Sequence, residues 1–341
     1  MIMEKKQIVF TEINKAELLT YEVEELKSDS VRVKLAVSTV SAGTEKANIT
    51  GDPSVNGPAA PNVKFPRKSG YSAAGTVIEI GEDVTDLQVG DRVIVSWGTH
   101  SSISTVQRKR ITKIPYDGIT FNQAAIVHIA TFPMAAIRKC QLEMGESAMV
   151  MGLGILGQFA IRMLRAAGAT PIIAADPVAK RREAALKGGA DYAFDPFDPD
   201  FAQKVKEVTG GGVNVAIEVT GQGAGLDETL DCMARFGRIA LLGCTRNKEF
   251  HIDYYRKVHS PGITLIGAHT MARPLQESHH GWFTEKDDLK AILDMMHYGR
   301  LVLDDLDTEI NSPENCPDVY TRLINDREFP LIAQFDWSRL E

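Results

Sequence analysis

Three glycines in the stretch GLGILG, at residues 152–157, lie between a short apolar run and a helical pattern. The run SAMVMG at 147–152 predicts a buried strand that leads into a glycine turn. Behind the turn, apolar residues recur at helical spacing and share one face: Ile155, Leu156, Phe159, Ala160, Met163, Leu164 and Ala167. A G-x-G-x-x-G turn between a strand and a helix is typical of dinucleotide-binding domains.

Each glycine has its own predicted role in that motif. Gly152 permits the tight turn, Gly154 lets a pyrophosphate approach the backbone, and Gly157 lets the helix pack closely on the sheet. The amides at the start of the helix, including those of Ile155 and Leu156, would face the negative charge of the cofactor. The alternative is that the glycines serve packing alone.

Asp176 ends the next predicted strand, at 169–176, and indicates which cofactor is bound. A carboxylate at this position accepts hydrogen bonds from the adenosine ribose and repels a 2′-phosphate, so we expect NAD rather than NADP. Arg181 is the complication, because it is close enough in sequence to stack on the adenine or to tolerate a phosphate. Thr220 follows the predicted strand at 213–219 and Gly243 ends the one at 237–243, and both are also expected to contact the cofactor.

The rest of the chain shows two patterns of apolar and polar residues. Apolar and polar residues alternate between turn signals up to about residue 120, which predicts the short antiparallel strands of a closed barrel. Short apolar runs then alternate with helical stretches, which predicts a parallel sheet. We therefore expect an α/β protein with a doubly wound Rossmann NAD-binding domain at 123–269 and a barrel domain formed by 1–122 and 270–341. In the last part, Thr284 and Asp287 predict a capping box at a helix start.

Composition excludes several classes of function. A net charge of −7 over 341 residues leaves no excess of Lys and Arg for a nucleic-acid partner. No run of apolar residues is long enough to span a membrane, and the N-terminal stretch does not read as a signal peptide. The four cysteines lie far apart, as reduced thiols of a cytoplasmic protein do. We expect a cytoplasmic protein that acts on a small molecule, without nucleic-acid or membrane partners.

The chain resembles the medium-chain dehydrogenase/reductase superfamily, the alcohol-dehydrogenase-like enzymes. The matching stretches follow the family's order from about residue 20 to 340: VSAGTEKANITG, GYSAAGTVIEIGEDVTDLQVGDRVIV, AAIVHIATFPMAAI, VMGLGILGQFAIRMLRAAGA, DPVAKRREAALKGGAD, VAIEVTG and FGRIALLG. The resemblance implies a GroES-like catalytic barrel beside the Rossmann domain.

The zinc-dependent members of that family carry metal ligands that this sequence lacks. Their C-G-[ST]-D loop is replaced by Ala42-Gly43-Thr44-Glu45, and their G-H-E by Gly70-Tyr71-Ser72. His128 stands at the third ligand position. We expect no catalytic metal; the alternative is that Glu45 and His128 together hold an atypical one.

Without a Lewis acid, a side chain must take the proton of the substrate hydroxyl. His128 is the first candidate and Tyr71 the second, with Thr44 as a proton relay and Glu45 as a group that holds Tyr71, Thr44 or a backbone amide. Each of these also has a structural reading: His128 as a core residue, Tyr71 as filler of the metal's space, Glu45 as a fold-stabilising residue.

Three further residues are expected to line the substrate pocket: Trp97, His269 and Arg273. Trp97 falls where the family places an aromatic wall, and an Arg at 273 is suited to clamp a carboxylate or phosphate. His100, His279 and His280 are expected on the surface.

The first expectation for function is a zinc-independent NAD-dependent alcohol dehydrogenase acting on a polyol, sugar or sugar acid. The alternatives are an NADPH-dependent enoyl or quinone reductase, an epimerase or lyase that retains NAD, and a nucleotide-binding protein without catalysis. The runs GRIALLG (237–243) and GITLIGAH (262–269) are expected to be edge strands of a homodimer, with a tetramer as the alternative.

Overall fold

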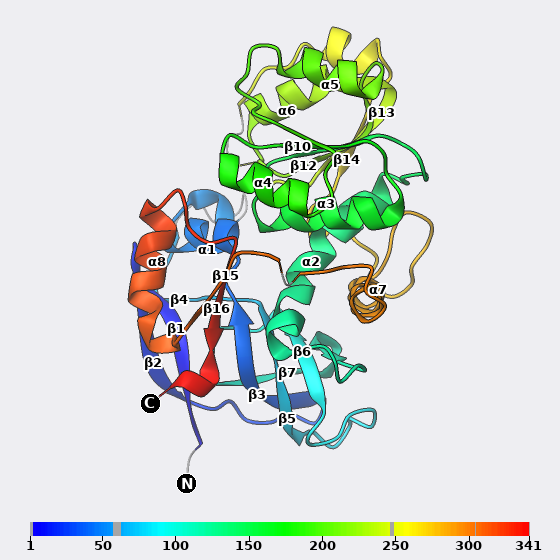
Figure 1. Cartoon of the computed structure of the whole chain (residues 1–341). Helices are drawn as coiled ribbons and strands as arrows, with labels where there is room; N and C mark the ends of the chain where they lie inside the picture. Colours follow the sequence, from blue (N-terminus) through cyan, green and yellow to red (C-terminus); the bar gives the residue numbers. More distant parts are fainter. Residues whose placement is uncertain (1–2, 57–62, 246–248, 304, 341) are drawn as a thin grey trace. The chain divides into compact units, whose positions relative to one another are not determined.

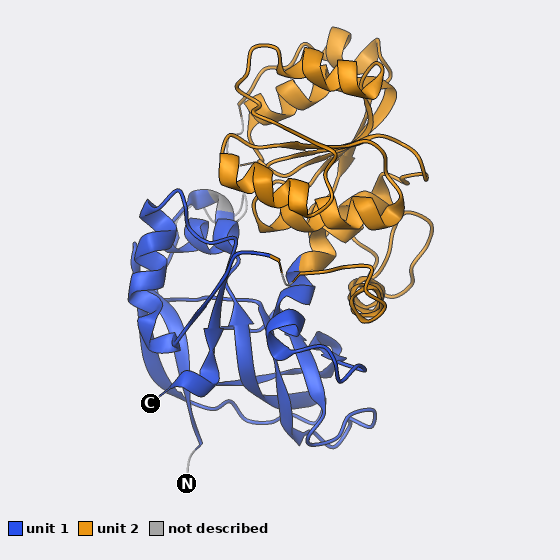
Figure 2. Ribbon diagram, viewed as in Figure 1, with its two compact units in different colours: residues 1–129, 306–341 blue, residues 130–305 orange. Residues whose placement is uncertain are grey.

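A computed structural model describes residues 3–56, 63–245, 249–303 and 305–340, which form two compact units. Unit 1 comprises Met1–Ile129 and Leu306–Glu341, and unit 2 comprises Ala130–Asp305 (Figure 2). None of the helices within the described ranges is long and apolar enough to cross a bilayer.

Unit 1 is built from two sheets and carries helices α1 (Ala42–Ile49) and α8 (Cys316–Asn325). One sheet has the order β2-β1-β4, and the other the order β15-β16-β3-β5-β6-β8 with β7 also paired to β3. The strands are β1 (Glu4–Glu12), β2 (Lys15–Glu22), β3 (Ser30–Thr39), β4 (Arg67–Lys68), β5 (Ser72–Ile80), β6 (Arg92–Ser96), β7 (Ile103–Gln107), β8 (Ile111–Lys113), β15 (Thr308–Asn311) and β16 (Ile332–Asp336). The pairings are antiparallel except for β15 with β16.

The C-terminal segment completes the core of unit 1. Strand β16 pairs with β3, where Phe335 lies opposite Ser38. Tyr320 of α8 packs edge-on against Phe10 of β1, with ring centroids 4.8 Å apart. Burial of such large rings is worth roughly 2–3 kcal/mol each, so residues 306–341 belong to the core of this unit.

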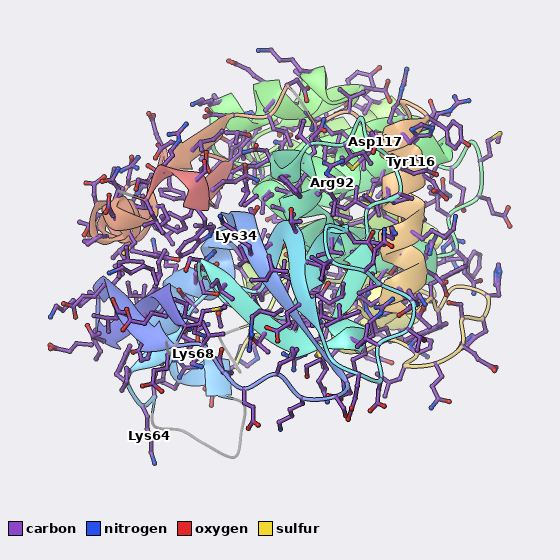
Figure 3. All side chains as sticks on the ribbon, turned by 90° about the horizontal axis from the view of Figure 1, so that it is seen from below. Lys34, Lys64, Lys68, Arg92, Tyr116 and Asp117 are labelled. Atoms are coloured by element: carbon purple, nitrogen blue, oxygen red, sulfur yellow. The ribbon has the colours of Figure 1, made fainter. Side chains whose placement is uncertain are left out.

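Helix α2 (Phe121–Lys139) is anchored at its start by one arginine. The Arg92 guanidinium donates to the carbonyls of Tyr116, Asp117 and Ile119 and lies 4.8 Å from the Phe121 ring centroid (Figure 3). Ser72 then donates its hydroxyl to the Ala125 carbonyl at 2.6 Å. These contacts fix the first half of α2, which carries His128, against the sheet of unit 1.

Unit 2 contains a six-stranded parallel sheet with the order β11-β10-β9-β12-β13-β14. Its strands are β9 (Ala148–Met151), β10 (Ile172–Ala175), β11 (Tyr192–Phe194), β12 (Val213–Glu218), β13 (Met233–Leu241) and β14 (Thr264–Gly267). Helices α3 (Ile155–Ala167) and α4 (Ala179–Lys187) cover one face, and α5 (Phe201–Thr209) and α6 (Gly223–Asp231) the other (Figure 1). Helix α7 is Glu285–His297, and Thr284 caps it by accepting from the Asp287 amide. The predicted Rossmann architecture and the cap at Thr284 are therefore confirmed. The return bond of a capping box is not made, because the Thr284 amide donates to Ser278 Oγ instead of the Asp287 carboxylate.

The division between the units differs from the predicted boundaries. It falls inside α2, at Ile129, and residues 270–305 group with unit 2 rather than with the barrel. The reason is electrostatic as well as apolar. Arg138 Nη1 of α2 donates a hydrogen bond to Asp288 Oδ1 of α7 at 2.5 Å. The Arg138 guanidinium also lies 3.9 Å from the Phe283 ring centroid.

Candidate active site

The glycine turn after β9 leaves little choice of residue at two of its three glycines. Gly152 has φ of +95°, in the left-handed region that favours glycine. A Cβ on Gly157 would lie 2.0 Å from the Gly152 carbonyl oxygen, so a side chain there would force α3 away from β9. A Cβ on Gly154 would meet nothing within 4 Å, which leaves open space beside the first residue of α3.

Asp176 lies just beyond β10 and is 3% exposed. Its Oδ2 accepts from the Leu153 amide and its Oδ1 from the Val178 amide, each at 2.8 Å. Arg181 Nη1 lies 3.7 Å from Oδ2. The carboxylate is thus fixed beside the glycine turn, and each oxygen keeps a further lone pair for another donor.

Glu218, the last residue of β12, binds the backbone of a second turn in unit 2. No motif in the sequence pointed to this residue. Its carboxylate accepts from the hydroxyl and amide of Thr220 and from the Gly221 amide, while its carbonyl accepts from the Gly243 amide. Burial raises the pKa of Glu218. A Cβ on Gly243 would lie 2.2 Å from the Gly221 nitrogen, so the two turns touch at their backbones. The signal in the sequence was a carboxylate at a strand end, two residues before Thr220-Gly221.

Unit 1 brings three rings together at the positions expected for chemistry. The Tyr71 ring stacks on Trp97 with centroids 5.6 Å apart, and His128 of α2 packs edge-on against both, at 5.7 Å and 4.8 Å. His128 is fully buried, while Tyr71 and Trp97 are partly exposed. The Tyr71 hydroxyl donates to Ser41 Oγ.

Trp97 has φ of +57°, which is rare for a bulky residue and costs about 1–3 kcal/mol. Two hydrogen bonds hold Trp97 in this conformation. The Trp97 amide donates to the Tyr71 carbonyl, and Arg110 Nη1 donates to the Trp97 carbonyl, both at 2.8 Å. Backbone strain of this kind, over-determined by its surroundings, occurs at functional sites.

Glu45 occupies a buried network instead of holding Tyr71 or Thr44 directly. Its carboxylate accepts from Tyr320 Oη at 2.5 Å and from the Ser41 amide at 2.7 Å, and it lies 3.1 Å from His100 Nε2. Burial and the Glu45 charge raise the pKa of Tyr320 well above its ordinary value, so the phenol keeps its proton. The backbone amide was one of the three partners expected for Glu45.

His100 is not a surface residue, as the sequence had suggested, but is fully buried. Its Nδ1 lies 2.7 Å from Ser38 Oγ, which also accepts from the Trp337 indole. The sequence could not indicate this burial, because the partners of His100 come from distant parts of the chain. Tyr320, the third member of this network, is 275 positions from Glu45, and no local pattern pointed to it.

The remaining predicted residues are exposed on their own unit or engaged in other contacts within it. Thr44 is exposed on the first turn of α1, and His269, His279 and His280 are exposed in unit 2. The Arg273 guanidinium donates to Asp288 and to the Thr131 carbonyl, each at 3.4 Å. Burial raises the pKa of Asp288 to about 6 despite Arg138 and Arg273, since desolvation outweighs their attraction. Arg273 therefore belongs to a buried charge cluster that ties α7 to α2.

Comparison with known proteins identifies the family of the chain. A family model described as alcohol dehydrogenase GroES-like domain matches residues 27–130, and one described as zinc-binding dehydrogenase matches residues 156–281. L-threonine 3-dehydrogenase of Pyrococcus horikoshii is 30% identical over 277 residues, which cover 72% of this chain and 75% of that protein. The chain belongs to the medium-chain dehydrogenase/reductase superfamily.

Two further matches extend over nearly the whole length of this chain. D-guloside 3-dehydrogenase of Escherichia coli is 27% identical over 340 residues, with 94% of this chain and 96% of that protein covered. The crystal structure of benzyl alcohol dehydrogenase from Acinetobacter calcoaceticus superposes with a TM-score of 0.85 at 19% identity, covering 98% and 99% of the two chains. The predicted GroES-like and Rossmann folds are confirmed, and the relatives show that the chain is an oxidoreductase of the dehydrogenase type.

The family implies a nicotinamide cofactor, and the residues of unit 2 suit one. The open space at Gly154, the helix start behind it and the fixed carboxylate of Asp176 are the groups that would receive pyrophosphate and ribose.

Zinc, which the family also implies, does not fit the donors of unit 1. Ala42 offers no ligand atom, and the Glu45 carboxylate is already held by Tyr320, His100 and the Ser41 amide. Within the described ranges, no group of three His, Cys, Asp or Glu side chains is placed to hold a metal.

Proposed function

We propose that this dehydrogenase oxidises a secondary alcohol of a polyol, sugar or sugar acid, or reduces the corresponding ketone, with NAD and without zinc. The observation that carries the proposal is the contact between Tyr71 and His128, which stand where zinc members of the family carry metal ligands. Tyr71 also hydrogen-bonds to Ser41 and so presents an oriented phenol.

The chemistry assigned to these side chains is the movement of one proton. A bound nicotinamide would accept the hydride from the carbinol carbon. Tyr71, as phenolate, takes the hydroxyl proton of the alcohol at its Oη and returns it in the reverse direction. His128 packs edge-on against Tyr71 with ring centroids 5.7 Å apart and so holds that ring; its imidazole is the second acid–base group of the proposal.

The polyol or sugar class is supported by the relatives. D-guloside 3-dehydrogenase of Escherichia coli covers 94% of this chain, and its name describes a dehydrogenase that acts on a D-guloside. The preference for NAD is supported by Asp176, whose buried charge at the ribose end of the site opposes a 2′-phosphate. Zinc independence is supported by the donor set of unit 1.

The first test follows nicotinamide absorbance with NAD and with NADP, using polyols, sugars, sugar acids and a D-guloside. The protein is treated with chelator and its metal content is measured on the same sample. We expect turnover with NAD in metal-free protein. Activity that disappears with chelator would refute zinc independence, and tight NAD binding without turnover on any alcohol would point to the cofactor-retaining or binding-only alternatives.

Two substitutions then test the roles of the rings. Tyr71→Phe and His128→Ala should each lower kcat by about 10²- to 10⁴-fold, the usual contribution of a general acid–base group, and leave the Kd for NAD unchanged. A kcat for Tyr71→Phe within twofold of the unsubstituted enzyme would leave Tyr71 as filler of the metal's space. Unfolding temperatures of both variants distinguish lost chemistry from lost packing.

A further inference from the structure

Ser41 is the residue before α1, where a serine ordinarily caps the helix by accepting a backbone amide. Here the side chain makes no capping hydrogen bond. Replacing a serine cap by alanine usually costs about 1 kcal/mol, so a hydroxyl diverted from this role has forgone a stabilising contact. Its Oγ instead accepts from the Tyr71 hydroxyl.

The backbone of Ser41 is held by a separate set of contacts. Its amide donates to Glu45 Oε1 at 2.7 Å, and its carbonyl accepts from the Glu45 amide at 2.8 Å. The Glu45 carboxylate is in turn fixed by Tyr320 and His100, and all four side chains in this chain of contacts are at least nine-tenths buried. Glu45 therefore places Ser41 without using the Ser41 hydroxyl.

We propose that Ser41 is a positioning residue that holds the Tyr71 oxygen and hydrogen-bonds to it in both of its protonation states. This inference rests on the proposed function, in which Tyr71 accepts the hydroxyl proton. When Tyr71 is a phenol, it donates to Ser41 Oγ, as observed. When Tyr71 is a phenolate, the Ser41 hydroxyl rotates and donates to it, keeping its own proton. A hydrogen bond to the charged form favours that form.

Other ionisable groups around Tyr71 come from several elements. His128 faces its ring from α2, and Arg110 binds the carbonyl of the stacked Trp97. Glu45, whose charge opposes a phenolate, lies behind Ser41 and is shared with His100 and with Tyr320 of α8. Ser41 is the neutral donor between that carboxylate and the phenol, so its removal takes away a favourable contact and leaves an unfavourable charge.

The test compares Ser41→Ala with Ser41→Thr, which restores a hydroxyl, in the full-length protein. Phenolate absorbance is titrated in each variant, and the same titration of Tyr71→Phe identifies the contribution of Tyr71. We expect the Tyr71 phenolate to form about one pH unit higher in Ser41→Ala and at the original pH in Ser41→Thr. The rise of kcat with pH should move by the same amount, which lowers kcat about tenfold on the slope of the profile.

The two readouts separate this inference from the proposed function. If the titration shifts but no alcohol is turned over, Ser41 has the assigned role and the proposed function fails. If alcohols are oxidised but titration and pH profile of Ser41→Ala match those of the unsubstituted enzyme, the inference is overturned. An unsubstituted protein whose titration equals that of Tyr71→Phe also overturns it. A purely structural role for Ser41 would lower the unfolding temperature without moving either pH curve.

Discussion

The Asp176 carboxylate accepts the Leu153 amide of the glycine turn and the Val178 amide beyond β10. The proposed function gives it a second role, in which its charge faces the adenosine ribose of a bound dinucleotide. The strand-end position was readable from the sequence, but its bonds to the backbone were not. An acid with both roles should affect cofactor choice more strongly than overall stability.

We expect Asp176→Ala to weaken NAD binding by about 10- to 100-fold, since hydrogen bonds to a charged group contribute roughly 1.5–3 kcal/mol. NADP binding should change little, because the lost attraction for the ribose is offset by the lost repulsion of the phosphate. Fluorescence titration with NAD and with NADP measures the ratio of the two affinities. Asp191→Ala is the matched control, since Asp191 also accepts a backbone amide, that of Ile172 at the start of β10, the end of the strand opposite to Asp176. An unchanged ratio of affinities in Asp176→Ala would remove Asp176 as the determinant.

Among single residues, prediction failed where the partner is distant. The sequence identified Glu45 as a holding group, yet its three partners included Tyr320 and His100, which no spacing rule connects to it. Arg273 was expected to bind substrate because of its chemistry. Its partners Asp288 and the Thr131 carbonyl lie on two different helices, and only the folded chain brings them together.

At the scale of elements, the turn between β9 and α3 was predicted with its boundaries nearly correct. Its pattern is local, since an apolar run, three glycines and an amphipathic face lie within 21 residues, 147–167. Strand β13 was placed less well. It begins at Met233, four residues before the predicted run at 237–243, because α6 ends at Asp231 and the chain already pairs with β12 at Met233.

The same turn offers a matched pair of substitutions. Gly157→Ala should lower the free energy of unfolding by about 1–3 kcal/mol or more, since its methyl would lie 2.0 Å from the Gly152 oxygen. Gly154→Ala should cost less, about 0.5–1 kcal/mol, because its methyl meets open space but alanine is a poorer N-cap than glycine.

Both variants should bind NAD more weakly, the first through a displaced helix and the second through a methyl in the space for the pyrophosphate. Thermal unfolding and calorimetric titration with NAD measure the two effects. Full NAD affinity in Gly154→Ala would mean that the cofactor does not approach this turn.

For the whole molecule, we propose a homodimer formed through β14. This strand is an edge of the parallel sheet, and its Leu265 is 38% exposed. The expectation that GRIALLG also forms an edge is wrong, because β13 lies between β12 and β14. Two copies of β14 related by a two-fold axis would pair antiparallel and satisfy each other's backbone groups.

Leu265→Lys should shift the protein toward a monomer, because a lysine on an edge strand blocks pairing. Sedimentation velocity over a range of protein concentrations measures the equilibrium between monomer and dimer. Tyr192→Lys on β11, the opposite edge, is the control and should leave the association unchanged. A dimer of equal affinity in Leu265→Lys would place the contact on another surface.

The sequence by itself determined the class of fold, the glycine turn with Asp176 and the cap of α7. Each of these depends on residues close together in the chain or on the identity of a single residue. Tertiary structure alone decided that residues 270–305 join unit 2, that His100 is buried, and that Glu45 serves Ser41 rather than Tyr71. The reason is physical: the energy of a buried charge or hydroxyl depends on its neighbours in space, and here those neighbours come from segments up to 275 residues apart.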